Sequence, residues 1–294
     1  MADEVEVLAT GYHLTEGPRL DDDGTLYFTD VLAGSLHCLR ADGKVDRIGP
    51  PRIDMAAGLV VGQRGTVICS DLQGLTRVHP ASGSAARLNL IDPDHVVRDV
   101  NDIEADKDGG IWGGVIDRAA GARGDPIESW APGPLFRVDR SGRVTVAAEL
   151  QSPNGLGFSP DGQILYAVQS AHGVWAYDLG QDHSLRNGKL FARVDDPDKP
   201  DGPRGCDGLE VDAEGGIWVA CVLSSELLRY RPDGTLDRRV PLPMMPTSLI
   251  FGGPDMGDIY VTGGDFWNPG KGGILRIRSD VPGKPSFKAE VWGA

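Results

Sequence analysis

The sequence is poor in the features that mark secreted, membrane-spanning or zinc-binding proteins. Its 294 residues contain only four cysteines, Cys38, Cys69, Cys206 and Cys221, with no CxxC pair and no paired histidine spacing. Cysteines scattered in this way indicate neither a disulfide framework nor a zinc finger, and they favour a reducing cytoplasm. The opening residues MADEVEVLATGYHL have no basic segment followed by an apolar one, so no signal peptide is expected. No apolar run reaches the roughly 18 residues of a membrane span.

Positive charge is also scarce. The chain has 29 Lys and Arg against 43 Asp and Glu, and its formal net charge is −14. Because an acidic surface repels phosphate backbones, nucleic acid is not an expected partner. The sequence contains no GxSxG motif, so nothing in it indicates a serine nucleophile. Glycine and proline, in contrast, are abundant at 41 and 21 residues, which favours many short strands joined by turns.

One short phrase occurs six times in the chain. It is a turn containing glycine followed by aliphatic, aromatic and small residues, as in DDGTLYFTD and DKDGGIWGGV. The turn glycines are Gly24, Gly65, Gly109, Gly162, Gly215 and Gly257. A short apolar segment precedes each phrase, and these segments read TEGPRL, AAGLVV, VNDIEA, PNGLGF, CDGLEV and PTSLIF. Segments in which apolar and polar residues alternate follow each phrase, and this period is typical of half-buried strands.

Units of about 40 to 50 residues with four antiparallel strands are typical of β-propeller blades. The sequence therefore predicts an all-β fold, a six-bladed β-propeller of four-stranded antiparallel blades that forms a single domain over residues 1–294. The N-terminal segment EVEVLAT is expected to complete the last blade, which otherwise ends in FKAEVWG. This closure would leave no exposed sheet edge in the ring.

The apolar segment that opens each unit is expected to form the innermost strand of its blade. The residues at which these strands begin would then converge at one end of the central channel, and they are Glu16, Ala57, Asn101, Asn154, Asp207 and Thr247. Four of the six are Glu, Asn or Asp, and Asn and Asp are depleted in strands. Buried carboxylates that face each other need a cation, and oxygen ligands suit calcium, magnesium or manganese. The alternative is that these residues only form turns before glycine.

These segments also carry a family resemblance. TEGPRL, VNDIEADKDGGIW, SPNGLGFSPDGQILY, CDGLEVDAEGGIWVA and MMPTSLIFGGPDMGDIYVT resemble signature segments of the SMP-30, gluconolactonase, regucalcin and luciferin-regenerating-enzyme-like family. The resemblance spans almost the whole chain. It implies a six-bladed propeller with one divalent metal ion in the channel, calcium ahead of magnesium, manganese or zinc. It also implies that Glu16, Asn154 and Asp207 are metal ligands, that Asn101 contacts substrate and that Asp207 is the general base.

The chain departs from the family pattern at two positions. EGPRL has Leu20 where the family often has an aromatic residue, and Asp99 stands where well-studied lactonases of the family have an arginine. Arg98 is one residue out of phase with that position. Because one step along a strand turns a side chain to the other face, Arg98 would contact substrate only if a bulge re-aimed it.

Two connections between the second and third strands of a unit are long, residues 116–133 and 263–273. Long loops in compact domains are usually functional or disordered. These two contain Trp130 and Trp267, which are predicted to shape the substrate pocket, with packing of the propeller surface as the alternative. His172, in the short loop SAHGV, is either a further residue at the channel opening or an incidental surface residue.

Together these features predict a metal-dependent hydrolase of a lactone or related ester. The metal would polarise the ring carbonyl, and Asp207 or the neighbouring Asp102 would take the proton of the attacking water. The expected partner is the small-molecule substrate, with no nucleic acid and no membrane, and the oligomeric state is left open. Two alternatives remain: metal-assisted cleavage of a C–C or phosphoester bond on the same scaffold, and a non-catalytic propeller that binds a cation or a partner.

Overall fold

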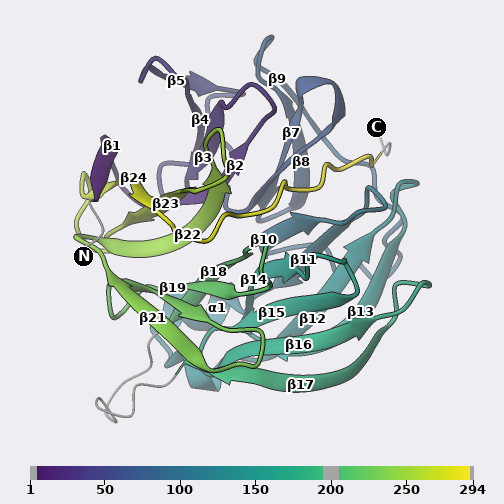
Figure 1. The fold of residues 1–294 in the computed structure, drawn as a ribbon. Helices are drawn as coiled ribbons and strands as arrows, with labels where there is room; N and C mark the ends of the chain where they lie inside the picture. The colour runs from purple at the N-terminus through teal and green to yellow at the C-terminus, as the bar shows by residue number, and fades with distance from the viewer. Residues whose placement is uncertain (1–4, 195–204, 292–294) are drawn as a thin grey trace.

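The computed structural model describes residues 5–194 and 205–291, and almost all of its regular structure is β-strand (Figure 1). The strands form six four-stranded sheets whose neighbouring strands are antiparallel. The predicted six-bladed β-propeller with four-stranded blades is therefore confirmed. Among the described residues, no helix has the length and apolar character needed to cross a membrane.

Each blade runs from an inner strand to an outer strand, and the strands follow in that order. Blades 1 to 3 consist of β2 (Thr15–Leu20), β3 (Leu26–Asp30), β4 (Ser35–Leu39) and β5 (Val45–Ile48); β6 (Leu59–Val61), β7 (Val67–Asp71), β8 (Gly74–His79) and β9 (Ser84–Arg87); and β10 (Val100–Ala105), β11 (Ile111–Val115), β12 (Pro132–Val138) and β13 (Val144–Gln151). Blades 4 to 6 consist of β14 (Pro153–Phe158), β15 (Ile164–Gln169), β16 (Gly173–Leu179) and β17 (Leu185–Arg193); β18 (Cys206–Val211), β19 (Ile217–Cys221), β20 (Glu226–Tyr230) and β21 (Leu236–Pro241); and β22 (Met245–Gly252), β23 (Asp258–Gly264), β24 (Gly272–Arg278) and β1 (Glu6–Tyr12). The described helices are the α-helix α1 (Arg118–Arg123) and the 3-10 helices η1 (Gln63–Gly65) and η2 (Ile127–Ser129).

The inner strands of neighbouring blades pack against one another in a closed ring. The ring runs from β2 through β6, β10, β14 and β18 to β22, which contacts β2 again. Large apolar side chains fill the space between blades, and Trp112 and Trp218 are fully buried there. All six inner strands therefore begin at one end of the central channel, which we call the mouth, and finish at the opposite end.

Blade 6 joins the two ends of the chain. β1 pairs with β24, so the N-terminal strand is the outermost strand of the last blade, as predicted. The expectation that this blade ends in FKAEVWG is wrong for the described part of that segment, residues 287–291, because the blade ends at Arg278. The outer position beside β24 is already taken by β1, and Pro282 and Pro285 interrupt the segment that follows.

The C-terminal segment, residues 279–291, instead crosses the end of the propeller opposite the mouth (yellow in Figure 1). Backbone hydrogen bonds tie it to several blades, since its groups bond to Ala213, Met256, Val61 and Gly109 at 2.7 to 2.9 Å. Phe287 packs edge-on against Phe158 of blade 4. The segment thus links blades that are far apart in the sequence.

In four of the six inner strands a glycine follows the channel-lining residue, and it is required where inner strands approach closely. A Cβ on Gly155 of β14 would lie 2.3 Å from the backbone nitrogen of Leu209 and 2.7 Å from the carbonyl oxygen of Asp207. A Cβ on Gly208 would lie 2.3 Å from Ser248 Oγ on the next strand. The Gly-Leu shared by SPNGL and GCDGL is therefore a packing feature of the ring, and the residue before it is left to face the channel.

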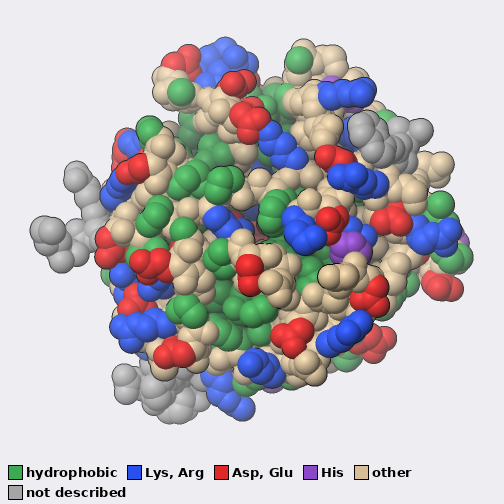
Figure 2. Space-filling view, turned by 45° about the vertical axis from the view of Figure 1, so that its right-hand side comes forward, with side chains coloured by type: hydrophobic (Ala, Val, Ile, Leu, Met, Phe, Trp, Pro, Cys, Tyr) green, Lys and Arg blue, Asp and Glu red, His purple; other side chains and the backbone are tan. Residues whose placement is uncertain are grey.

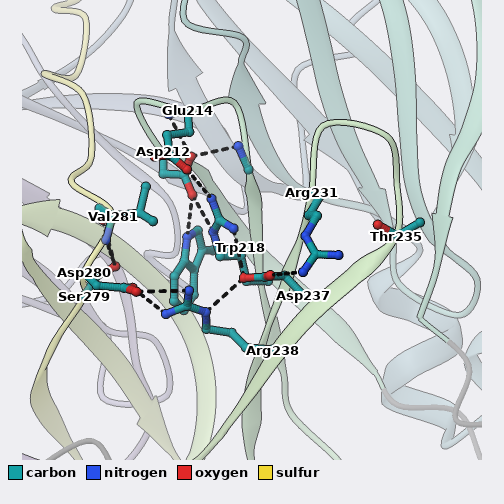
Figure 3. Close-up of polar contacts among 12 residues, drawn as sticks. Asp212, Glu214, Trp218, Arg231, Thr235, Asp237, Arg238, Ser279, Asp280 and Val281 are labelled. Atoms are coloured by element: carbon teal, nitrogen blue, oxygen red, sulfur yellow. Dashed lines mark hydrogen bonds and ion pairs between the residues drawn. The ribbon is translucent and has the colours of Figure 1, made fainter.

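The glycine turns of blades 3 and 5 are closed by buried polar corners. In blade 5, Asp212 accepts hydrogen bonds from Trp218 Nε1 at 3.0 Å and from Arg229 Nε at 2.8 Å. Figure 3 shows this corner beside Asp237 and Arg238, and Arg238 forms an ion pair with Asp280 of the C-terminal segment. The same corner in blade 3 is made by Asp106, Trp112 and Arg137. Charge-assisted bonds of this kind stabilise the turns at the end opposite the mouth.

Candidate functional site

The inner strands of three blades share a distinctive start at the mouth. Two residues before Asn101, Asn154 and Asp207 stand Asp99, Ser152 and Gly205, and all three have left-handed backbone conformations, with φ of 51°, 46° and 61°. Asp and Ser visit this region at a cost, since it is readily accessible only to glycine. The same left-handed backbone conformation therefore turns the chain at the start of β10, β14 and β18 and directs the next residues toward the channel.

Asn154 is held between two neighbours. Its Oδ1 accepts a hydrogen bond from Asn101 Nδ2 at 2.8 Å, and its Nδ2 donates to Ser170 Oγ at 3.1 Å. Asn154 is buried, while Asn101 is half-buried. The structure thus brings these two predicted site residues together, and it adds Ser170 as a residue that orients the Asn154 amide.

Glu16 and Asp207 come from separate blades and repel each other. Burial raises the pKa of Glu16 well above its usual value, and the charges of Asp207 and Asp102 raise it further. Burial likewise raises the pKa of Asp207, the charge of Asp102 adds to this effect, and a hydrogen bond with Asn154 opposes it. Asp207 keeps some exposure, whereas Glu16 is buried. Two acidic groups forced together in this way form a natural site for a cation.

Asp102 is the third carboxylate of this group. It is buried, and burial raises its pKa to about 6, although the nearby Arg19 acts in the opposite direction. The predicted residues Glu16, Asp102 and Asp207 are therefore close enough to influence one another electrostatically. A cation bound among them would relieve the repulsion and burial that raise their pKa values.

Deeper in the channel the acids are paired with cations that were not predicted from the sequence. Arg19 Nη2 lies 2.7 Å from Glu104 Oε2, and Lys284 Nζ lies 3.8 Å from Glu210 Oε1. Burial raises the pKa of Glu104 to about 7 even with Arg19 beside it. Acidic and basic groups are thus matched in this deeper layer, whereas Glu16, Asp102 and Asp207 form no ion pair with the residues that the structure describes.

The repeat contains the signal for these deeper residues. Arg19, Glu104 and Glu210 each lie three positions after a mouth residue. A strict strand period of two would place such residues on opposite faces. A bulge intervenes in each strand, however, and in β2 it lets Glu16 oppose Thr29 while Arg19 opposes Tyr27. Residues three apart therefore share a face.

The donor set fits a hard divalent cation. Two carboxylates, from Glu16 and Asp207, and the amide oxygen of Asn154 are the ligand types that calcium prefers. In the described part of the chain, no three His, Cys, Asp or Glu side chains by themselves form a group able to hold an ion. The candidate set accordingly depends on the Asn154 amide as well as on the acids, and Asn101 lies within hydrogen-bonding distance of that amide.

The other predicted residues make their described contacts outside this set. Arg98 is exposed. Trp130 is half-buried, its Nε1 donates to the Asp125 carbonyl at 3.0 Å, and its ring packs against Gly121 of α1, so it stabilises its own loop. Trp267 is 74% exposed and contacts only Phe266 among aromatic side chains of the described residues. His172 is exposed and bonds to Gln151.

The chain matches the SMP-30/gluconolactonase/LRE-like region over residues 14–264. It is 30% identical to a pentonolactonase of Haloferax volcanii, with 97% of each chain covered. It is 29% identical to a 6-deoxy-6-sulfogluconolactonase of Pseudomonas putida, with 88% of each covered. Among solved structures, a calcium-binding protein, regucalcin, from Agrobacterium tumefaciens is 26% identical, with 98% of each chain covered and a TM-score of 0.82.

A closed six-bladed propeller with acids gathered at one end of its axis defines the general class of this protein. Within that class, the chain belongs to the SMP-30/gluconolactonase/LRE-like family. The resemblance predicted from the sequence segments is confirmed. These relatives include lactonases, so the family context supports lactone hydrolysis.

Proposed function

We propose that this protein is a divalent-metal-dependent lactone hydrolase whose metal is held by Glu16, Asn154 and Asp207. The observation that carries the proposal is a pair of mutually repelling carboxylates, Glu16 and Asp207, at the mouth, of which Asp207 hydrogen-bonds to the Asn154 amide. Relatives named as lactonases support the reaction, and a relative named as a calcium-binding regucalcin supports calcium as the first ion to test.

The metal and the residues that hold it have different roles in the proposed reaction. A bound divalent cation supplies Lewis acidity toward the lactone carbonyl. Asp207 accepts a proton from the attacking water, because it is the acid of the set that keeps access to solvent. Water adds to the carbonyl carbon, the ring C–O bond breaks, and the proton passes to the departing alkoxide, which yields a hydroxy acid.

The surrounding groups position these reactants. Asn101 holds the Asn154 amide and stands where it can also contact substrate. Asp102 lies deeper than Asp207, beside Arg19, so it keeps the inner side of the mouth acidic. Trp130 and Trp267, in the two long loops, stay predicted contacts of the substrate.

The proposal is tested by measuring metal content and lactone turnover in wild type and in two variants, Asp207→Asn and Asp233→Asn. Purified wild type is expected to hold about one divalent ion per chain by mass spectrometry and to hydrolyse glucono-1,5-lactone in a pH-indicator assay. Chelation should abolish turnover, and reloading with calcium, magnesium, manganese or zinc should restore it. Asp207→Asn keeps the shape but removes the charge, and it is expected to lose the metal and at least about 100-fold in kcat/KM.

Asp233→Asn serves as the matched control, because Asp233 is an exposed turn residue of the same blade. It should retain metal and activity. Full activity in metal-free wild type would refute the metal dependence. Stoichiometric metal without turnover of any lactone would refute the hydrolase assignment and favour another metal-assisted cleavage or a cation-binding role.

A further inference from the structure

The long loop between β11 and β12 brings one arginine to the mouth. Asp117 caps α1 by accepting a hydrogen bond from the backbone nitrogen of Ala120 at 2.9 Å. This cap fixes Arg118, the first residue of α1. Arg118 Nη2 donates to the carbonyl oxygen of Val100 at 3.1 Å, and Val100 directly precedes Asn101 in β10. The guanidinium therefore lies at the start of an inner strand, next to the candidate site.

Arg118 is half-buried, and its guanidinium is only partly paired. Its Nε is buried and has no hydrogen-bond partner among the residues that the structure describes. Burial lowers the pKa of Arg118, and the charges of Asp99 and Glu16 oppose that change. Glu16 is a candidate metal ligand, so Arg118 lies within electrostatic reach of the centre of the site. A buried donor without an acceptor is unfavourable, and a bound ligand with oxygen acceptors would relieve that cost.

Arg118 differs in this respect from Arg98 and Arg123, while Arg19, whose Nε also lacks a partner among the described residues, is already paired with Glu104. Arg123, on the same helix, is exposed and forms an ion pair with Asp125 at 2.7 Å. Arg98, which the sequence places next to the site, is exposed as well. Of Arg98, Arg118 and Arg123, Arg118 alone has a buried Nε without a partner among the described residues.

We propose that Arg118 is the substrate-binding cation of this site and that it selects lactones that carry ring hydroxyl groups. The inference rests on the proposed lactone hydrolysis. A guanidinium presents several N–H donors in a rigid plane, and hydroxyl and carbonyl oxygens of a polyhydroxylated lactone are matching acceptors. A site built to donate hydrogen bonds discriminates against analogues that lack the accepting groups.

The test compares two lactones and three variants of the metal-loaded protein. Arg118→Met keeps the length of the side chain but removes the donors, Arg118→Lys keeps the charge, and Arg123→Met is the control on the same helix. For glucono-1,5-lactone, Arg118→Met should raise KM about tenfold or more, and Arg118→Lys should give an intermediate value. For δ-valerolactone, which has no ring hydroxyl, kcat/KM should change less than about twofold. Arg123→Met should behave as wild type with both substrates.

A binding measurement keeps the test independent of turnover. Wild type should bind 1,5-anhydro-D-glucitol, a ring polyol that cannot be hydrolysed, by saturation-transfer NMR, and Arg118→Met should not, while both hold the same amount of metal. An unchanged KM, or equal losses with both lactones, would overturn the role of Arg118 in a working lactonase. If wild type hydrolyses neither lactone, the proposed function fails, and only the polyol-binding measurement then tests Arg118. Loss of binding in Arg118→Met would support its role. Absence of binding in wild type would overturn it.

Discussion

Acidic residues at the two ends of the propeller differ in their electrostatic partners. At the mouth, Glu16 and Asp207 are brought together without a cation from the described residues to balance them fully, which suits a metal site. At the far end, Asp106 is matched by Arg137 Nε at 2.6 Å and by Trp112 Nε1 at 3.1 Å. Similar residue types therefore repel each other in one place and stabilise the fold in the other, according to their partners.

Replacing Asp106 should weaken the fold in a pH-dependent manner. Burial alone would raise the pKa of Asp106, but hydrogen bonds and the charge of Arg137 outweigh it and lower the pKa overall. A group whose pKa is lowered by folding stabilises the protein above its unfolded pKa, about 3.9. That contribution is lost as the pH falls through the folded value. Asp106→Asn should therefore cost about 3 kcal/mol of unfolding free energy at pH 7 and less below about pH 4.

Urea denaturation at several pH values measures this difference. Asp23→Asn, at an exposed turn position, is the control and should change stability by less than about 0.5 kcal/mol. A difference between wild type and Asp106→Asn that does not shrink in acid would contradict the argument.

At the scale of elements, the segment that follows β24 is a strap rather than a strand. Residues 279–291 bond to groups of blades 2, 3, 5 and 6 across the end opposite the mouth. Phe287 packs against Phe158 with ring centroids 6.3 Å apart, and Lys284 reaches Glu210 in the channel. The strap thus supports inner strands whose other ends form the candidate site.

Shortening Phe287 should loosen this strap without touching the mouth. Phe287→Ala is expected to lower the unfolding free energy by about 2 kcal/mol, because the ring is partly buried against two apolar clusters. Metal content and KM should stay as in wild type. Lys288→Ala, which removes only an exposed ion pair with Asp22, is the control and should cost less than about 1 kcal/mol. Loss of metal in Phe287→Ala, measured on folded protein, would mean that the two ends of the channel are coupled.

At the scale of the whole molecule, one strand pairing closes the ring. β1 comes from the N-terminus and pairs with β24, and the Arg276 guanidinium adds an ion pair with Glu6. On the face seen in Figure 2, acidic and basic side chains are intermingled, so the net charge of −14 is not gathered there into one acidic patch. The closure, not surface charge, is expected to control the cooperativity of the fold.

Removing residues 1–12 should therefore destabilise the entire propeller. The edge of β24 would be unpaired and open to association with other chains. We expect a melting temperature lower by about 10 °C or more and a tendency to aggregate, measured by thermal denaturation and size-exclusion chromatography. Glu6→Gln, which removes only the ion pair, should change the melting temperature by about 2 °C or less. A truncated protein that melts like wild type would show that blade 6 is stable with three strands.

Much of the architecture was predictable because the chain repeats itself. Six glycine turns with alternating segments indicated six blades, and equivalent positions in the repeat pointed to Glu16, Asn101, Asn154 and Asp207 at one end of the channel. These predictions depend on short-range patterns, which strand periodicity and turn chemistry control locally. The closing role of the N-terminal strand was predictable for the same reason, since a ring of blades leaves an edge to fill.

The sequence by itself thus determined the fold, the family and the end of the channel at which polar residues meet. Only the tertiary structure decided which of them touch. The bond between Asn101 and Asn154, the bulge that aligns Glu16 with Arg19, the path of residues 279–291 and the placement of Arg118 all join segments that no local pattern relates. The physical reason is that backbone bulges, loops and long-range hydrogen bonds depend on how the blades pack, and a repeat specifies each blade but not the irregular segments between them.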